Sequence, residues 1–205
     1  MNPRVDLAQK RGELRDHIRD AAIAEFAENG LRGASTQAIA DRAGITKTKL
    51  HYYIDSKEDL YQQSLDHIVG IWEELFDGIP LDLGPEAFLS FYITRKISFS
   101  IHHPAEVRMF ANEIMRGAPM LRSHWAGSRA STLRAAARIE DWVSAGLIRQ
   151  VDPMLLQFNI WALTEHYALM APEVRYMLGL AEDAPLDEAK IAAEVTMLVL
   201  RGLKP

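Results

Sequence analysis

The sequence predicts an all-α protein of about nine helices, and three observations lead to that prediction. Apolar residues recur three and four positions apart along most of the chain, which is the spacing of a helix with one buried face. Glycines and prolines fall between the periodic segments, at positions where helices commonly end or begin. No stretch alternates apolar and polar residues in the manner of a half-buried strand. We therefore expect helices packed on helices, without a sheet.

The first 56 residues read as three helices around a small core. The first helix is expected over about 10–29, because an apolar stripe there ends at Gly30. The second is expected over 36–43 and the third over about 47–54, with Gly44 in the tight turn between them. We expect their shared core to contain Phe26, Ile39, Leu50 and Ile54.

Two short helices joined by a tight turn form a helix-turn-helix, and the outward side chains indicate what it contacts. Ser35 and Thr46 have hydroxyls that can cap the two helices by accepting from backbone amides. Leu50 lies on the buried side of the helix expected over 47–54. The cationic, hydroxyl and aromatic side chains of that helix therefore project outward, as on helices that read the DNA major groove. We expect base contacts from Lys47, Thr48, Lys49, His51 and Tyr52, and phosphate contacts from Ser35, Gln37, Tyr53 and Lys57.

The longer part of the chain, over 57–205, reads as a second helical domain that follows a DNA-binding domain over 1–56. Its first helix, over about 57–76, begins within the DNA-reading segment and so links the two domains. Prolines stand near the start of most later helices, where a missing amide costs least. These helices are expected over 85–102, 104–116, 120–146, 153–171 and 186–203.

Composition excludes several kinds of chemistry. The chain has no cysteine, which excludes disulfides, thiol catalysis and cysteine-ligated zinc. Its start has no apolar signal segment, and no run approaches the ~20 apolar residues that cross a bilayer, so we expect a cytoplasmic protein. His102 and His103 are neighbours on a predicted helix and point about 100° apart, which makes them a poor chelate. With no catalytic motif present, we expect no metal, no cofactor and no enzyme.

The net charge of −5 does not by itself indicate a DNA-binding protein, but its distribution is compatible with one. Residues 1–58 hold 10 Lys and Arg against 9 Asp and Glu, whereas residues 59–205 hold 13 against 19. The acidic excess therefore lies outside the segment that carries the helix-turn-helix.

The N-terminal pattern resembles that of the TetR family of transcriptional regulators. The resemblance covers about residues 14–61 and is carried by IRDAAIAEFAENG and STQAIADRAGITKTKLHYYIDSKEDLY. His51 stands where members commonly have a DNA-contacting tyrosine, and Ile54 where phenylalanine is usual. The positions that match in order and spacing are Phe26, Gly30, Ile39, Ala40, Ala43, Gly44, Leu50, Tyr53, Ser56 and Lys57.

The C-terminal part resembles the TetR subgroup that includes uracil-sensing regulators of pyrimidine utilisation. This resemblance spans about residues 60–178 and includes MRGAP, VDP and IWALTEHY. It implies that Trp161 lines an effector pocket with the residue four positions on, where the subgroup has glutamine and this chain has Glu165. An amide donates and accepts, whereas an ionised carboxylate only accepts, so we expect an effector with N–H donors, such as a pyrimidine or an amine-bearing compound.

The residues of this part allow a pocket but leave a plainer interpretation open. Trp161 and Glu165 share one face of the helix expected over 153–171, and pocket walls are mostly apolar with few polar groups. The alternative is that Trp161 is core, Glu165 a surface acid, and Glu113 a buried acid paired with an arginine. The residues expected to line the pocket are Tyr92, Phe99, Met109, Phe110, Glu113, Trp161 and Glu165.

The resemblance implies a homodimer formed through 153–171 and 186–203, which are amphipathic and suit half of a four-helix interface. We expect a repressor that binds a near-palindromic operator and is released by a small nitrogenous metabolite. Three alternatives remain: an activator of the same fold, a helical ligand-binding protein that does not bind DNA, and a small all-α enzyme working through Glu113 or Glu165.

Overall fold

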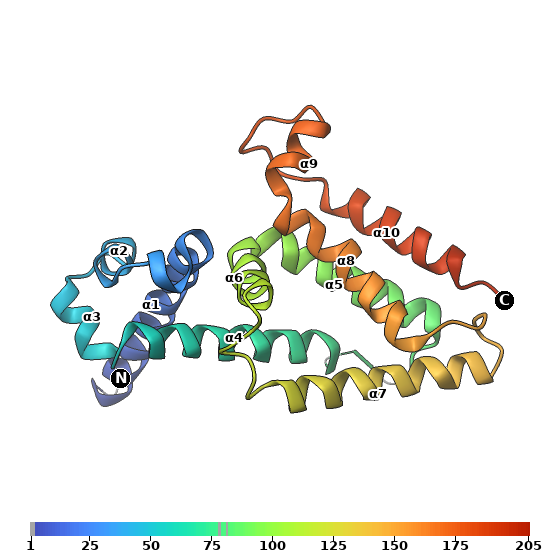
Figure 1. The fold of residues 1–205 in the computed structure, drawn as a ribbon, viewed down its shortest axis with the longest axis horizontal. Helices are drawn as coiled ribbons and strands as arrows, with labels where there is room; N and C mark the ends of the chain where they lie inside the picture. The colour runs from blue at the N-terminus through green and yellow to red at the C-terminus, as the bar shows by residue number, and fades with distance from the viewer. Residues whose placement is uncertain (1–2, 78, 81) are drawn as a thin grey trace. The chain divides into compact units, whose positions relative to one another are not determined.

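The computed structural model describes residues 3–77, 79–80 and 82–205, and over these ranges the chain forms ten α-helices without a strand (Figure 1). The all-α prediction is confirmed. The helices are α1 (Pro3–Gly33), α2 (Thr36–Arg42), α3 (Lys47–Tyr53), α4 (Lys57–Asp77), α5 (Pro85–His102), α6 (Pro104–Met115), α7 (Trp125–Ser144), α8 (Pro153–Leu169), α9 (Ala171–Met177) and α10 (Glu188–Gly202).

Contacts divide the chain into two compact units. Unit 1 contains Met1–Ile68 and Arg108–Arg122, and unit 2 contains Val69–Val107 and Ser123–Pro205. Helix α4 therefore begins in unit 1 and ends in unit 2, and α6 also contributes residues to both.

The core of unit 1 brings α1, α2, α3 and the first half of α4 together. Phe26 of α1 is fully buried and meets the ring of Tyr61 edge-on, with the ring centroids 4.9 Å apart. Ile39, Leu50 and Ile54 are also buried, so the core predicted for this part of the chain is confirmed.

Unit 2 is built around α5, which packs against both α8 and α10 (Figure 1). Apolar side chains of these three helices and of α7 form one continuous core. Two polar residues of α5, Lys96 and Ser100, are buried along with them. The largest fully buried apolar side chains of this core are Ile79, Leu89, Ile93, Ile97 and Ile160.

Three differences from the prediction stand out. Helix α1 starts at Pro3 instead of about residue 10, because a proline suits the first helical position. Helix α7 begins at Trp125 and not at 120. Helix α9 was not predicted: Pro172 was taken to end the preceding helix, whereas it lies in the first turn of a new one.

In the described parts of the chain, helix lengths and hydropathies fall short of what a membrane crossing requires. Over the same residues, histidines and carboxylates do not gather in groups of three that could hold a metal ion.

Candidate DNA-binding helix and effector site

The helix-turn-helix owes its shape to two caps and one glycine. The hydroxyl of Ser35 accepts from the amide of Ala38 at 3.0 Å, and that of Thr46 accepts from the amide of Lys49 at 3.1 Å. Gly44 has a φ of 62°, which lets the chain leave α2 and enter α3 without steric penalty. The caps and the turn predicted from the sequence are therefore confirmed.

Helix α3 is anchored by one side and exposed on the other. Leu50 is its one fully buried residue, and Ile54, which caps the helix, is buried beyond it. Tyr53 is half-buried. The five residues expected to read bases are all exposed: Lys47, Thr48, Lys49, His51 and Tyr52.

The residues expected to contact phosphates have intramolecular roles in this structure. Ser35 caps α2, and the exposed Gln37 donates to Asp41 one turn further on, at 2.7 Å. The Lys57 ammonium donates to the backbone carbonyl of Ala34 at 2.8 Å. The helix dipole disfavours a cation at a helix N-terminus, and the partial negative charge of this carbonyl oxygen offsets that effect. The hydrogen bond also ties α4 to the residue before the α2 cap. Whether these side chains also bind phosphate stays a prediction.

An ion-pair network that was not predicted holds α2 against α1. Arg42 pairs with Glu28 at 2.6 Å and with Glu25 at 3.4 Å. These partners, Glu28 foremost, raise the pKa of Arg42. The network fixes the helix that supports α3 from behind.

In unit 2, a buried lysine lies beside the predicted pocket acid. The Lys96 ammonium is 2.9 Å from the Glu165 carboxylate, and only 2% of Lys96 is exposed. It also lies 3.9 Å from the centroid of the Trp72 ring and 6.0 Å from that of Trp161. Burial lowers the pKa of Lys96, and Glu165 opposes that shift in part.

A hydrogen bond completes this group. The indole N–H of Trp161 donates to the hydroxyl of Tyr92 at 3.0 Å, and burial raises the pKa of that hydroxyl. We call these five residues the Lys96 cage: Trp72, Tyr92, Lys96, Trp161 and Glu165. The cage carries one cation and one anion between aromatic walls, so it can donate to one ligand atom and accept from another.

The structure divides the predicted pocket residues between the two units. Tyr92, Trp161 and Glu165 belong to the cage, and Phe99 meets Trp72 edge-on with ring centroids 5.0 Å apart. The other three, Met109, Phe110 and Glu113, belong to unit 1.

Glu113 is fully buried and well supplied with partners. It accepts from the hydroxyl of Tyr61 at 2.9 Å and from the amide of Met120 at 2.8 Å, and Arg116 lies 3.7 Å away. Burial, followed by this hydrogen bond, raises the pKa of Tyr61. This is the arrangement that the plainer interpretation of Glu113 described, and a ligand role for Glu113 stays a prediction.

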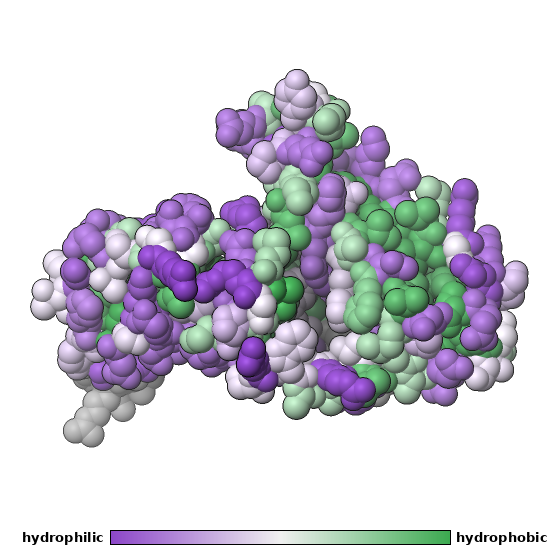
Figure 2. All heavy atoms as spheres, in the orientation of Figure 1, coloured by the Kyte–Doolittle hydropathy of each residue, from purple (hydrophilic) through white to green (hydrophobic). Residues whose placement is uncertain are grey.

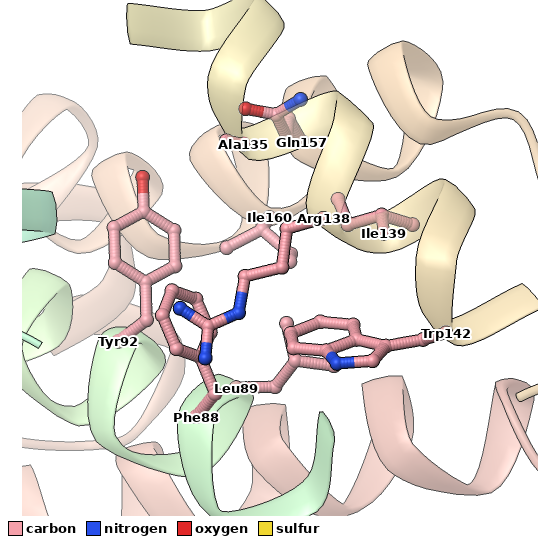
Figure 3. Close-up of a pocket in the computed structure, with 9 residues that line it drawn as sticks. All are labelled: Phe88, Leu89, Tyr92, Ala135, Arg138, Ile139, Trp142, Gln157 and Ile160. Carbon is pink, nitrogen blue, oxygen red and sulfur yellow. The ribbon is translucent and has the colours of Figure 1, made fainter. Parts of the chain in front are cut away.

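Unit 2 also contains a small pocket that the sequence did not indicate (Figure 3). The Arg138 guanidinium lies in it, 4.3 Å from the ring centroid of Phe88 and 5.3 Å from that of Trp142. Burial lowers the pKa of Arg138. The pocket has room for roughly one water molecule. Its lining consists of Phe88, Leu89, Tyr92, Ala135, Arg138, Ile139, Trp142, Gln157 and Ile160, of which only Tyr92 was predicted.

Sequence reasoning missed two residues of the cage, Trp72 and Lys96, and of these Lys96 is the one that carries a charge. It stands in ITRKISF, where a lysine reads as an exposed cation. The available signal was its position: four residues after Tyr92 and three before Phe99 places it on the buried face of α5.

The fold and these sites define a class of protein: a helix-turn-helix DNA-binding regulator with a separate helical body. Comparison with known proteins supports this class. Residues 18–63 match the model of the bacterial regulatory proteins of the tetR family, and residues 65–205 match that of the YcdC-like protein C-terminal region. The chain belongs to the TetR family of transcriptional regulators, and it is therefore a regulator and not an enzyme.

Individual relatives extend over nearly the whole chain. The HTH-type transcriptional regulator RutR of Escherichia coli O157:H7 is 34% identical over 189 residues, which is 92% of this chain and 89% of that protein. The transcriptional regulator SCO4942 of Streptomyces coelicolor has the same fold, with a TM-score of 0.71, 23% identity, and coverage of 93% of this chain and 99% of that one. AibR in complex with isovaleryl coenzyme A and operator DNA gives a TM-score of 0.69 at 18% identity, with coverage of 90% and 97%.

Proposed function

We propose that this protein is a homodimeric repressor that a small nitrogenous metabolite releases from a near-palindromic operator. The observation that carries the proposal is the presence, in one chain, of an outward-facing α3 and the buried Lys96 cage. Two relatives support it. SCO4008 of Streptomyces coelicolor, 25% identical over 83% of this chain, is an HTH-type transcriptional repressor, and the AibR complex contains both a small molecule and operator DNA.

The DNA side of the proposal assigns residues 1–56 to operator binding. Lys47, Lys49 and the other exposed side chains of α3 enter the major groove, while the N-terminal end of α4 lies at the phosphates. Because His51 can donate or accept according to its protonation, it does not restrict the base that it faces.

The charges of the cage favour one class of effector over another. A cationic amine beside Glu165 would also lie beside the Lys96 ammonium, which is 2.9 Å from that carboxylate, so an amine is disfavoured. A ring that carries an N–H next to a carbonyl matches both groups, because Glu165 accepts from the N–H and Lys96 donates to the carbonyl. Trp72 and Trp161 supply flat apolar walls for such a ring. We therefore favour an uncharged pyrimidine-like compound over an amine.

Helix α4 offers a route from the effector to the DNA. It begins with Lys57, bonded to Ala34 next to the α2 cap, and it carries Trp72 of the cage four turns later. An effector that inserts beside Trp72 displaces this helix and thereby the placement of α3. For release to occur, the effector must bind the displaced form more tightly than the DNA-bound form.

A homodimer accounts for apolar residues that α8 and α10 leave exposed. Figure 2 shows apolar side chains gathered over these two helices. Leu155 and Phe158 of α8 are 57% and 45% exposed, and Leu198 of α10 is 61% exposed. Patches of this kind mark interfaces, and a second copy with the same patch forms a twofold four-helix contact. The two α3 helices then need a spacing of roughly 34–36 Å to enter successive major grooves.

A ligand screen tests the effector assignment. Uracil, thymine, adenine and putrescine are added to wild type, Glu165→Gln and Lys96→Met in a thermal-shift assay, because a ligand that binds the native state raises its melting temperature. We expect a shift from the pyrimidines, a changed ranking in Glu165→Gln, and no shift in Lys96→Met. Stabilisation by putrescine alone, or hits that ignore both substitutions, contradicts the pocket assignment.

An operator experiment tests the regulatory part. A duplex enriched from a random library by the protein is used in gel-shift titrations with and without the hit from the screen. We expect a symmetric enriched sequence, weaker binding at higher salt, and release by the ligand. Tighter binding on ligand addition identifies a different regulatory sign, and salt-insensitive binding contradicts the phosphate contacts.

A further inference from the structure

The N-terminal part of α1 contacts the exposed face of α3. Arg11 donates a hydrogen bond to the hydroxyl of Tyr52 at 3.2 Å, and its guanidinium carbon lies 5.6 Å from the centroid of the Tyr52 ring. Tyr52 is 71% exposed, and its other ring contact is with Tyr53, edge-on at 5.5 Å. The arginine and Tyr53 therefore both contribute to the orientation of Tyr52 on the DNA-reading helix.

This arginine keeps its charge available to a ligand. In the described part of the chain, the Arg11 guanidinium forms no ion pair with a carboxylate, and neither does that of Arg15 one turn further along α1. Both side chains are exposed, and residues four apart lie on one face of a helix. By contrast, Arg19 pairs with Asp16 at 2.9 Å, and Arg42 is neutralised by glutamates.

Resting on the operator binding proposed for α3, we propose that Arg11 is a DNA-recognition residue, which binds a phosphate at the edge of the groove read by α3 and positions Tyr52 for its own contact there. Phosphates border the groove that a recognition helix enters. A guanidinium within reach of the Tyr52 hydroxyl extends the cationic surface of α3, provided by Lys47 and Lys49, onto α1. A guanidinium has five N–H donors in a planar fork, so it can bind a phosphate while one N–H still reaches Tyr52.

The same geometry allows a weaker interpretation, in which the contact is an incidental surface pair. Exposed pairs of this kind contribute little to folding stability. If the contact is incidental, removing the Arg11 guanidinium leaves the operator affinity unchanged, and so does removing the Tyr52 hydroxyl. The two interpretations differ in DNA binding and not in stability.

The test is a double-substitution cycle in the full-length protein, with operator affinity measured by fluorescence anisotropy at several salt concentrations. The proposed dimer carries two copies of Arg11, so we expect Arg11→Gln to weaken binding about 5- to 20-fold and to reduce the slope of log affinity against log salt by about 1.8, which is about 0.9 for each lost phosphate contact. Tyr52→Phe removes the hydroxyl and keeps the ring. Because Arg11 acts partly through that hydroxyl, its substitution in the Tyr52→Phe background should have a smaller effect than in wild type.

Two variants make the result specific. Arg11→Lys keeps the charge but not the planar fork, so it should restore most of the salt slope and only part of the affinity. Arg32→Gln removes an exposed cation at the other end of α1 and is the matched control. A wild-type affinity and slope for Arg11→Gln, an equal loss for Arg32→Gln, or additive effects of the Arg11 and Tyr52 substitutions each overturns the proposal. Circular dichroism checks that all variants remain folded.

Discussion

Substitution of Glu165 should destabilise the protein much more than substitution of Lys96, because the two groups of this ion pair differ in access to water. Lys96 has 3% of its side chain exposed and Glu165 has 27%. At their 2.9 Å separation and an effective dielectric constant of about 20, the gross attraction is roughly 6 kcal/mol. Glu165→Gln keeps one acceptor but leaves the ammonium buried without an anion. Discounted for the partial exposure of Glu165, we expect the substitution to cost about 2–3 kcal/mol.

The opposite substitution should be tolerated. Lys96→Met removes the buried cation and keeps an unbranched apolar stem against Trp72. Glu165, being partly exposed, can then turn its carboxylate to water. We expect Lys96→Met to lie within about 1 kcal/mol of wild type, as replacements of buried charges by apolar groups often do.

The stability lost in Glu165→Gln should depend on pH, and the direction follows from the pKa of Lys96. Burial holds the pKa of Lys96 below its ordinary value, and the loss of Glu165 lowers that pKa further. Between the native pKa and the unfolded value of about 10.4, the unfolded state binds more protons, so stability rises with pH. The deficit of Glu165→Gln should therefore shrink as the pH increases from 7 to about 9.5, whereas Lys96→Met should show no such recovery.

Urea unfolding followed by tryptophan fluorescence measures the free energy of unfolding of unit 2, which contains the pair. All four tryptophans, at 72, 125, 142 and 161, belong to unit 2, so the signal reports the unit that contains the pair. Protein concentration is held fixed, because dimerisation contributes to apparent stability. Equal stability of wild type and Glu165→Gln, or greater damage from Lys96→Met, refutes the reasoning.

Three further substitutions test other parts of the molecule. Lys49→Ala should weaken specific operator binding by about 1–3 kcal/mol if the lysine reads a base, and an unchanged affinity in a gel-shift titration removes it from the interface. Tyr61→Phe removes the hydroxyl that donates to the buried Glu113 at 2.9 Å. It should lower the free energy of unfolding, measured by circular dichroism, by about 1–2 kcal/mol. An unchanged free energy of unfolding means that water or Arg116 replaces the donor. Leu198→Asp places a charge in the exposed apolar surface of α10 and should shift the dimer towards monomer in analytical ultracentrifugation, whereas an intact dimer locates the interface elsewhere.

The part of the fold that sequence reasoning predicted well is the part governed by local chemistry. The caps at Ser35 and Thr46 and the turn at Gly44 depend on residues within four positions of each other, so their types and spacing suffice. The unpredicted α9 shows the limit of such signals. A proline such as Pro172 is compatible with either the end of one helix or the first turn of the next, and only the surrounding packing decides between them.

The candidate sites were predicted less completely, because their residues are distant in sequence. Lys96 and Glu165 are 69 positions apart, and Arg11 and Tyr52 are 41 apart. Glu165 and Tyr52 were predicted as site residues, whereas Lys96 and Arg11 each read as an ordinary cation in its own segment. Burial of a lysine, or the orientation of an exposed tyrosine, depends on a partner that no local pattern identifies.

That dependence changed the inferred chemistry of the effector. Glu165 considered alone predicts a ligand rich in N–H donors, and an amine satisfies this as well as a pyrimidine does. The structure places a buried ammonium against the same carboxylate, so the site already contains the cation that an amine would supply. We expect an effector that binds in the cage to have a neutral edge that donates and accepts, since any ligand with a net charge leaves one like-charge contact in a poorly solvated site. We therefore propose that the Lys96–Glu165 pair, and not the acid alone, sets the specificity of the effector site.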